Sequence, residues 1–295
     1  QCGLLVFGVF SEHALIVLNF FGFDEGCYPF CSGVTDVPLQ IIGPKHLTVV
    51  AAFVVFCLSF IYFRSAWNDK QKRNMRIAMA VALAAAEISI HIWWLYWGIW
   101  NIQTTLPLHL CSIMVWITVY VAFSDNKNLY DFTYFLGIGG ALQAFLTPAD
   151  ASMYDIPHYR VMQTLIAHGL LIAIPIYMTV VEGYRPTLAS FKRIFIWTNI
   201  YMVAIFFLNR AIGSNYLFIA EKPPSPTLLD VLSPWPWYIP QLEILAFAIL
   251  FILYLPFLFS DLYFKRQSQS TAYLPTSQKY KLLGRSYVAH TPALS

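Results

Sequence analysis

The sequence predicts an all-α membrane protein, a polytopic transmembrane bundle of about seven helices, and three observations support this prediction. Only 11% of the 295 residues are charged and 58% are hydrophobic, whereas soluble domains carry about 25% charged residues. Apolar runs close to the ~20 residues of a spanning helix recur along the chain. Lys and Arg are concentrated in alternate loops, which is typical of a membrane protein with one fixed orientation.

Seven apolar runs account for the predicted helices, and none shows the residue alternation of an outer-membrane barrel. They cover residues 45–64, 76–98, 106–124, 129–147, 161–182, 191–212 and 240–262. Gly43 and Pro44 precede the first run, and Pro148 and Pro157 bracket the loop after the fourth. Seven helices make one compact bundle, so we expect residues 43–262 to form a single transmembrane domain.

Two segments flank this domain. Residues 1–42 are expected to lie outside the membrane or at its surface, with an eighth span over residues 4–23 as the alternative. Cys27 and Cys31 fall in this segment, where a disulfide and two unlinked thiols are both compatible with the sequence. Residues 263–295 are polar without periodicity, which predicts a disordered tail.

The Lys and Arg residues predict the orientation of the bundle. Fourteen of the 18 fall on the side that holds residues 64–76, 185–193 and the C-terminal segment. Basic loops stay in the cytoplasm, which places the N-terminus outside and the C-terminus in the cytoplasm. We therefore expect a multi-pass protein of the plasma membrane if the source is bacterial, or of the endoplasmic reticulum if it is eukaryotic. The net charge of +3 reflects this asymmetry, and no patch indicates a nucleic-acid partner.

Polar side chains inside the apolar runs gather toward the predicted outer ends of the helices. Ionisable residues are costly in a bilayer and are commonly functional there. The candidates that the predicted topology brings to similar depth are Glu87, His91, His109, Cys111, Gln143, His168, Asn209, Asn215 and Glu243. A polar pocket that opens to the outer leaflet is therefore the candidate site.

Residues 106–112 are the most informative stretch, because they place an imidazole, a thiol and a hydroxyl at the start of one run. Pro107 suits the first position of a helix. Cys111 is then expected within one turn of a helix N-terminus, where a thiol gains thiolate character. His109 and Cys111 are two residues apart and point to different sides of a helix. A base for Cys111 must come from another helix, and His168 is the best-placed imidazole.

Each candidate also has a purely structural interpretation. Glu87 and His91, four residues apart, would pair on one helix face. Arg210 and Glu243 would form an ion pair, and Cys111 would be an inert buried thiol. Interhelical hydrogen bonds would use the amides of Gln143, Asn199 and Asn209. The chain would then be a packed bundle with no chemistry of its own.

Motifs spread over residues 43–262 resemble those of the YwaF family of integral membrane proteins. The matching stretches are residues 43–47, 106–112, 135–144, 157–160, 167–169, 181–186, 197–201, 213–218 and 235–238. That family is similar to a vertebrate transmembrane cysteine-dependent acyltransferase, which moves polyunsaturated acyl chains onto lyso ether phospholipids. The resemblance implies a thiol nucleophile at Cys111 and a partner histidine at His168.

The first functional hypothesis is a membrane acyltransferase or lipid hydrolase that needs no cofactor. Cys111 would attack an ester carbonyl and His168 would accept the proton. Gln143, Asn209 or Asn215 would donate to the oxyanion. A membrane phospholipid or lysophospholipid would be the partner, and the sequence leaves the oligomeric state open.

Two other hypotheses belong to different classes. Glu87, His91 and Glu243 suit a proton-linked transporter or receptor with no covalent chemistry. A zinc or copper site would combine imidazole and thiol ligands from His91, His109, His168 and Cys111. No close ligand spacing supports that site, so we expect no bound metal.

Overall fold

The computed structural model describes residues 39–40, 43–148, 154–222 and 228–272, and within these ranges the chain forms helices and no β-strand. The predicted all-α class is confirmed. The predictions for residues 4–23, for Cys27 and Cys31, and for residues 273–295 lie outside the described residues.

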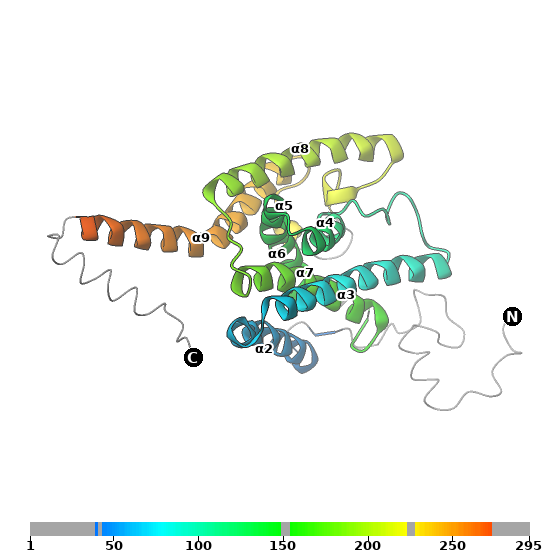
Figure 1. The fold of residues 1–295 in the computed structure, drawn as a ribbon. Helices are drawn as coiled ribbons and strands as arrows, with labels where there is room; N and C mark the ends of the chain where they lie inside the picture. Colours follow the sequence, from blue (N-terminus) through cyan, green and yellow to red (C-terminus); the bar gives the residue numbers. More distant parts are fainter. Residues whose placement is uncertain (1–38, 41–42, 149–153, 223–227, 273–295) are drawn as a thin grey trace, which may run out of the picture.

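Each of the seven predicted runs corresponds to helical structure (Figure 1). The helices are α2 (Pro44–Ala66), α3 (Asp69–Tyr96), α4 (Leu110–Ser124), α5 (Lys127–Phe132), α6 (Ile138–Leu146), α7 (Tyr159–Val180), α8 (Leu188–Ile212) and α9 (Tyr238–Ala272). Short 3-10 turns, η3 (Tyr216–Phe218) and η4 (Leu228–Val231), lie between α8 and α9. By length and composition α2, α3, α7, α8 and most of α9 are able to cross a membrane, and α4 is a shorter apolar helix.

Polar caps start the helices on one side of the bundle. Asn68 and Gln71 form a reciprocal capping box at the start of α3, and Thr187 and Ser190 do the same at the start of α8. Such boxes satisfy backbone N–H groups that the first helical turn leaves without partners. The short turns before α3 and α8 therefore end in well-defined helix starts.

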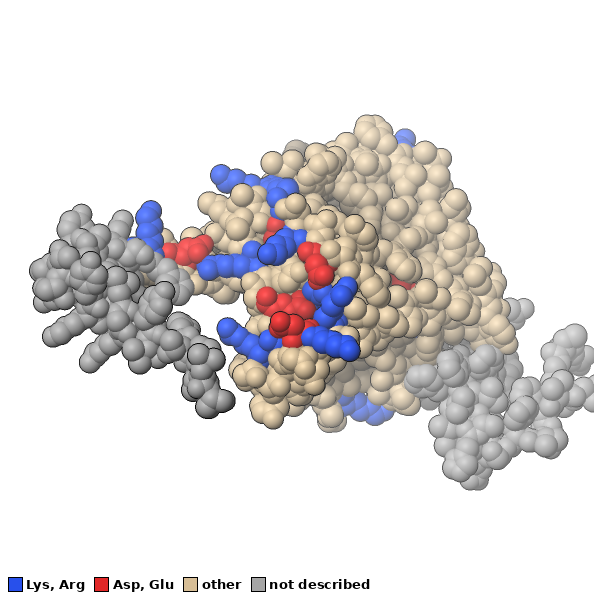
Figure 2. All heavy atoms as spheres, viewed as in Figure 1, with Lys and Arg blue, Asp and Glu red and all other residues tan. Residues whose placement is uncertain are grey.

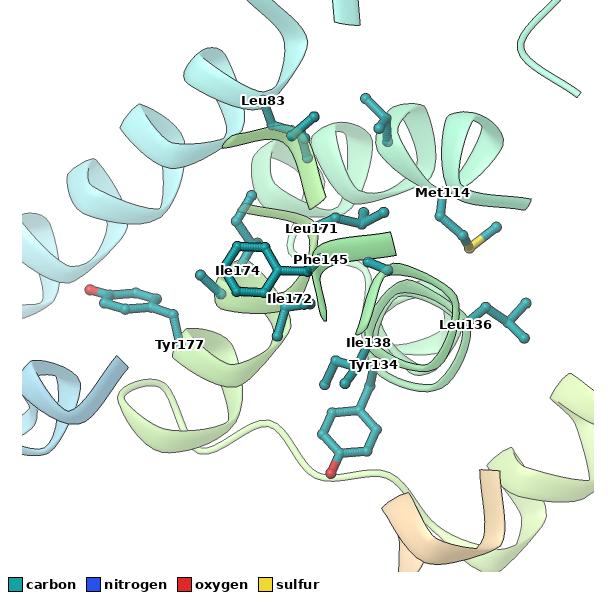
Figure 3. Packing of buried hydrophobic residues seen from close by; sticks show 14 of the residues in the cluster. Leu83, Met114, Tyr134, Leu136, Ile138, Phe145, Leu171, Ile172, Ile174 and Tyr177 are labelled. Carbon is teal, nitrogen blue, oxygen red and sulfur yellow. The ribbon is translucent and has the colours of Figure 1, made fainter. Parts of the chain in front are cut away.

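Helix α7 is the centre of the molecule and packs against α2, α3, α4 and α6. Figure 3 shows its Leu171, Ile174 and Tyr177 among side chains of the surrounding helices. In lipid, tight van der Waals packing rather than water exclusion holds helices together, and small residues permit it. Gly169 is such a residue, because an added Cβ would stand 3.3 Å from the ring of Phe145 on α6.

Three details differ from the prediction. The run at 129–147 is one span in sequence but is divided by a π-helical turn, η1 (Thr133–Gly137), whose wider winding interrupts the α-helix. Pro107 does not start α4, because a turn in which the Leu108 N–H meets the Leu106 carbonyl holds it outside the helix. At the other end of the chain, α9 continues to Ala272, inside the predicted tail.

The two ends of the bundle differ in their charges. Lys and Arg gather, with acidic residues between them, where α3 and α8 start and α4 and α7 end (left in Figure 2). We call this the ion-pair end, after its contacts of Arg76 with Asp125 and Glu182, of Arg193 with Asp131 and of Arg185 with Asp261. The opposite end, where α4, α7 and α9 start, is called the cavity end.

Candidate functional site

Two cavities lie toward the cavity end. The larger, of about 510 Å³, is lined mainly by apolar side chains of α4, α6, α8 and α9. The smaller, of about 270 Å³, is lined by residues of α3, α4, α6 and α7. Cys111, Ser112 and His168 line both cavities and are the residues that the two linings have in common.

The start of α4 positions Cys111. His109 is the N-cap and Leu110 the first helical residue, so Cys111 is the second residue of the helix, as its predicted place within one turn requires. The side chain of His109 makes no capping hydrogen bond, and the first N–H groups of the helix have no intrahelical partner. The Cys111 sulfur lies against Gly140 of α6, where an added Cβ would stand 3.4 Å from Sγ.

His168 lies in the third turn of α7, with Nδ1 2.8 Å from the backbone carbonyl oxygen of Thr164. A carbonyl oxygen only accepts hydrogen bonds, so Nδ1 carries the hydrogen of the neutral ring. Nε2 is then the basic nitrogen. The structure brings this imidazole and the Cys111 thiol to the walls of the same two cavities.

Glu87 lines the smaller cavity together with Ser112. His91 lies one turn further along α3, with Nε2 3.8 Å from Oε1 of Glu87, and its Nδ1 accepts from the indole of Trp100 at 3.3 Å. His91 lines neither cavity. The structural interpretation of Glu87 and His91 as neighbours on one helix face therefore matches the geometry.

Glu243 and Asn199 meet in the larger cavity. The Asn199 amide nitrogen donates to Oε2 of Glu243 at 3.0 Å and to the Phe195 carbonyl at 3.0 Å. This contact joins α8 to α9, as the interhelical interpretation of Asn199 expects. The expected pairing of Glu243 with Arg210 is not found among the ion pairs of the described residues. Gln143 lines the same cavity from α6.

Asn209 and Asn215 shape the loop after α8. Asn209 is buried and bonds the Tyr216 N–H, the Tyr216 carbonyl and the Ser214 hydroxyl at 2.7 to 2.9 Å. Asn215 accepts from the Ala220 and Glu221 N–H groups and donates to the Glu221 carbonyl. Neither amide lines a cavity, so the structure gives these two candidates a role in loop geometry.

The same loop covers His109. Leu217 and Phe218 adopt left-handed backbone conformations, with φ of 62° and 53°, and line the larger cavity together with Ile219. The ring of His109 lies 5.0 Å from that of Phe218 and 5.2 Å from that of Tyr216. Left-handed conformations of non-glycine residues are costly and persist only where other contacts enforce them. Here the amides of Asn209 and Asn215 hold the backbone on either side of these two residues.

Sequence reasoning gave no role to the polar wall of the smaller cavity. Arg160, Gln163 and Thr164 form that wall together with Glu87. Their spacing from His168 repeats every three or four residues, which is the helical signal that places them on one face of α7. The sequence shows a hydroxyl group within residues 106–112. It does not place Ser112 beside Glu87, because that depends on how α3 packs against α4.

The metal hypothesis finds no support in the described part of the chain. No group of three or more His, Cys, Asp or Glu side chains converges there as metal ligands. His91 and His109 lie apart from each other, since His91 faces Trp100 and His109 packs against the loop after α8. These two imidazoles therefore do not join His168 and Cys111 in one ligand set.

Comparison with known families gives one result. Residues 41–254 match the TMEM164 family. Searches of curated proteins and of solved structures find no significant match. The match covers every helix from α2 to α8 and the part of α9 up to Tyr254. It does not confirm the resemblance to the YwaF family.

Proposed function

The chain belongs to the TMEM164 family, and we propose that it is a cysteine-dependent acyltransferase that moves acyl chains between phospholipids. One observation carries the proposal: a thiol at a helix start and an imidazole with a defined basic nitrogen line the same two cavities. A nucleophile and a base in one pocket are the requirement for covalent acyl chemistry. The similarity to a cysteine acyltransferase that the motifs imply points to the same reaction.

The first half-reaction acylates the protein. His168 Nε2 takes the thiol proton, and the Cys111 sulfur attacks the ester carbonyl carbon of a phospholipid. The tetrahedral intermediate collapses with cleavage of the carbon–oxygen bond. The imidazolium returns its proton to the leaving oxygen, which gives a lysophospholipid and a thioester at Cys111.

The second half-reaction reverses these steps with a different alcohol. The hydroxyl of an acceptor lysophospholipid gives its proton to His168, and its oxygen attacks the thioester carbonyl. The carbon–sulfur bond breaks, the proton returns to sulfur, and a new phospholipid leaves. No oxidant, reductant or cofactor is needed.

Negative charge develops on the carbonyl oxygen in both halves. The first N–H groups of α4 are the donors nearest to Cys111 along the chain, and they have no capping side chain. Backbone N–H groups at a helix N-terminus favour anions, so they replace Asn209 and Asn215 as our preferred oxyanion donors. Gln143 remains a candidate, because it lines the larger cavity.

The chain is an integral multi-pass membrane protein, as its family and its apolar helices indicate. For its orientation we retain the sequence-based assignment, with the cavity end toward the outer leaflet and the C-terminus in the cytoplasm. Donor lipids would then enter sideways from the bilayer, since the loop with Leu217 and Phe218 lines the larger cavity at this end.

The test compares two cysteine variants in reconstituted vesicles. Cys111→Ser should lower the transfer of a labelled acyl chain from phospholipid to lysophospholipid by at least about 10³-fold, as removal of a nucleophile does in other enzymes. Cys57→Ser is the matched control, because Cys57 is on α2 and lines neither cavity. Equal transfer by the wild type and Cys111→Ser would refute the proposal.

Proton-linked transport is a second candidate, favoured by the Glu87 carboxyl 3.8 Å from the His91 imidazole. Proton flux across vesicles carrying the Cys111→Ser variant separates the two functions. A pH-driven flux that survives this substitution and is lost in Glu87→Gln would support transport. An acyltransferase should show no such flux.

A further inference from the structure

We infer that the two cavities divide the ester substrate between them. The larger holds the acyl chain, and the smaller holds the glycerol–phosphate portion of the leaving and the accepting lysophospholipid in turn. This inference rests on the proposed function. It adds that the acceptor lysophospholipid binds in the smaller cavity.

The two cavities share one wall, which contains Cys111. An ester consists of an acyl part and an alcohol part that meet at the carbonyl carbon. In a productive complex that carbon must lie beside the Cys111 sulfur, and Cys111, Ser112 and His168 are the residues common to both cavities. A bound ester therefore extends from this wall in two directions, one part into each cavity.

The residues that line each cavity indicate whether it binds the acyl part or the alcohol part of the ester. The larger cavity takes most of its wall from apolar residues of α8 and α9, such as Met202, Leu245 and Ile249. The smaller has half that volume and collects Glu87, Arg160, Gln163 and Thr164 on one side of the catalytic pair. An acyl chain matches the first lining, and a polar alcohol matches the second.

The polar residues suit a glycerol–phosphate group in particular. Arg160 is in the first turn of α7, and its guanidinium lies 5.7 and 5.6 Å from the ring centroids of Trp93 and Trp94. Arg is the side chain best matched to phosphate. Gln163 donates its amide N–H to the Ala86 carbonyl at 3.2 Å, so its amide oxygen remains to accept from a hydroxyl group.

This division explains how transfer competes with hydrolysis. The leaving alkoxide takes its proton from His168 on the side of the smaller cavity. The hydroxyl group of the acceptor must then bind in the same place. While an alcohol occupies that cavity, it keeps water from the thioester. Occupancy of the smaller cavity thus controls the second half-reaction, whereas the larger cavity controls the first.

A matched pair of alanines tests the division. Ala144 lines the smaller cavity and Ala246 the larger, and each is replaced by Leu in the full-length protein. The donor is a long-chain p-nitrophenyl ester, whose leaving group needs no polar subsite, and a butyryl ester serves as the short-chain donor. Acylation of Cys111 is followed by intact-protein mass, and its discharge by added lysophosphatidylcholine.

We expect Ala144→Leu to slow discharge by lysophosphatidylcholine at least about tenfold more than it slows acylation, because the p-nitrophenyl leaving group makes less use of the polar wall of the smaller cavity than a glycerol–phosphate group does. Ala246→Leu should slow acylation by the long-chain donor and leave the butyryl donor unaffected. Arg160→Gln, which adds no bulk, should raise the lysophospholipid concentration needed for half-maximal discharge.

Two results would count against the division. If Ala144→Leu slows long-chain acylation and leaves discharge unchanged, the assignment of the cavities is wrong although the acyltransferase function stands. If the wild-type protein never carries an acyl group on Cys111, the proposed function itself fails. The wild-type measurement thus separates the two failures.

Discussion

Acidic groups have different partners at the two ends of the bundle. At the ion-pair end Asp131 contacts Arg193, Asp261 contacts Arg185, and Asp125 and Glu182 contact Arg76, which is almost fully buried. Toward the cavity end Glu87 lies 3.8 Å from the His91 imidazole, and Glu243 accepts a hydrogen bond from the Asn199 amide. The four acidic groups named at the ion-pair end contact arginines, whereas no ion pair with Lys or Arg is found among the described residues for Glu87 and Glu243, which line the cavities.

This difference indicates which polar residues serve the fold and which are available for a ligand. A buried charge pair that loses one partner leaves the other charge uncompensated, so such pairs stabilise the structure once they exist. Carboxyl groups with neutral partners and an adjoining cavity keep the capacity to bind something else. Substitutions at the ion-pair end should therefore change stability, and those at the cavity end should change activity.

The largest effect is expected from His168→Gln. Removal of the basic nitrogen should lower acyl transfer by about 10²- to 10⁴-fold, the usual contribution of a general base. The thermal unfolding midpoint in detergent should stay near the wild-type value, because glutamine retains a side-chain N–H that can donate to the Thr164 carbonyl oxygen in place of Nδ1. Loss of folding with no separate loss of transfer would remove the distinction between the two ends.

Arg76→Ala should have the opposite profile. The change leaves Asp125 and Glu182 without their cation and should lower the free energy of unfolding by about 3–5 kcal/mol, as for other broken buried pairs. Denaturant titration in detergent measures this loss. Arg64→Ala, an exposed site on α2, is the control. Folded Arg76→Ala protein should retain its transfer rate.

Asn209→Ala should lower stability although Asn209 is at the cavity end. It removes three hydrogen bonds of a buried amide and leaves the Tyr216 backbone unsatisfied, at a cost of about 1–3 kcal/mol. The residue is at the cavity end, yet stability should fall first. If transfer falls at unchanged stability, Asn209 belongs to the reaction after all.

Gly140→Ala should produce a smaller, purely catalytic effect. The new methyl group would stand 3.4 Å from the Cys111 sulfur and 3.4 Å from Leu110, which is contact without overlap. It should shield the sulfur and slow acylation by about tenfold or less, within the range seen for small displacements of reacting groups. Alkylation of Cys111 by a maleimide, which requires access to the sulfur but no acyl donor, should slow in parallel.

Arg185→Ala is expected to change least. Arg185 and Asp261 are both well exposed, with side-chain exposures of 39% and 54%. Exposed ion pairs contribute about 0–1 kcal/mol, so the unfolding free energy should scarcely move and transfer should not change. A loss as large as that of Arg76→Ala would show that the whole ion-pair end acts as one network.

The helices, and the position of Cys111 and His168 at the same end of the bundle, were predictable, because apolar runs and their alternating direction carry that information. The partners of polar residues were not. Arg76 reads as a loop cation in sequence, since nothing there indicates that α3 starts at Asp69 and carries it inside the bundle. The sequence places Asn209 among the cavity residues, but its hydrogen-bond partners lie in the loop that follows α8.

The smaller cavity was missed for a related reason. Its polar wall combines Glu87 of α3 with Arg160 and Gln163 of α7. Periodicity places the latter two on one face of their helix, but it does not say which neighbour that face meets. Only the packing of α3 on α7, the most extensive contact between helices here, fixes this.

The length of α9 has a mechanical consequence. Its 35 residues span about 52 Å at 1.5 Å per residue, whereas the hydrocarbon core of a bilayer is about 30 Å thick. The turns after Tyr263 alone extend the axis by about 14 Å, and α9 projects well past the other helices in Figure 1. The helix is therefore long enough to extend past the bilayer, and a bend at Pro256 would set the direction in which it leaves the membrane surface.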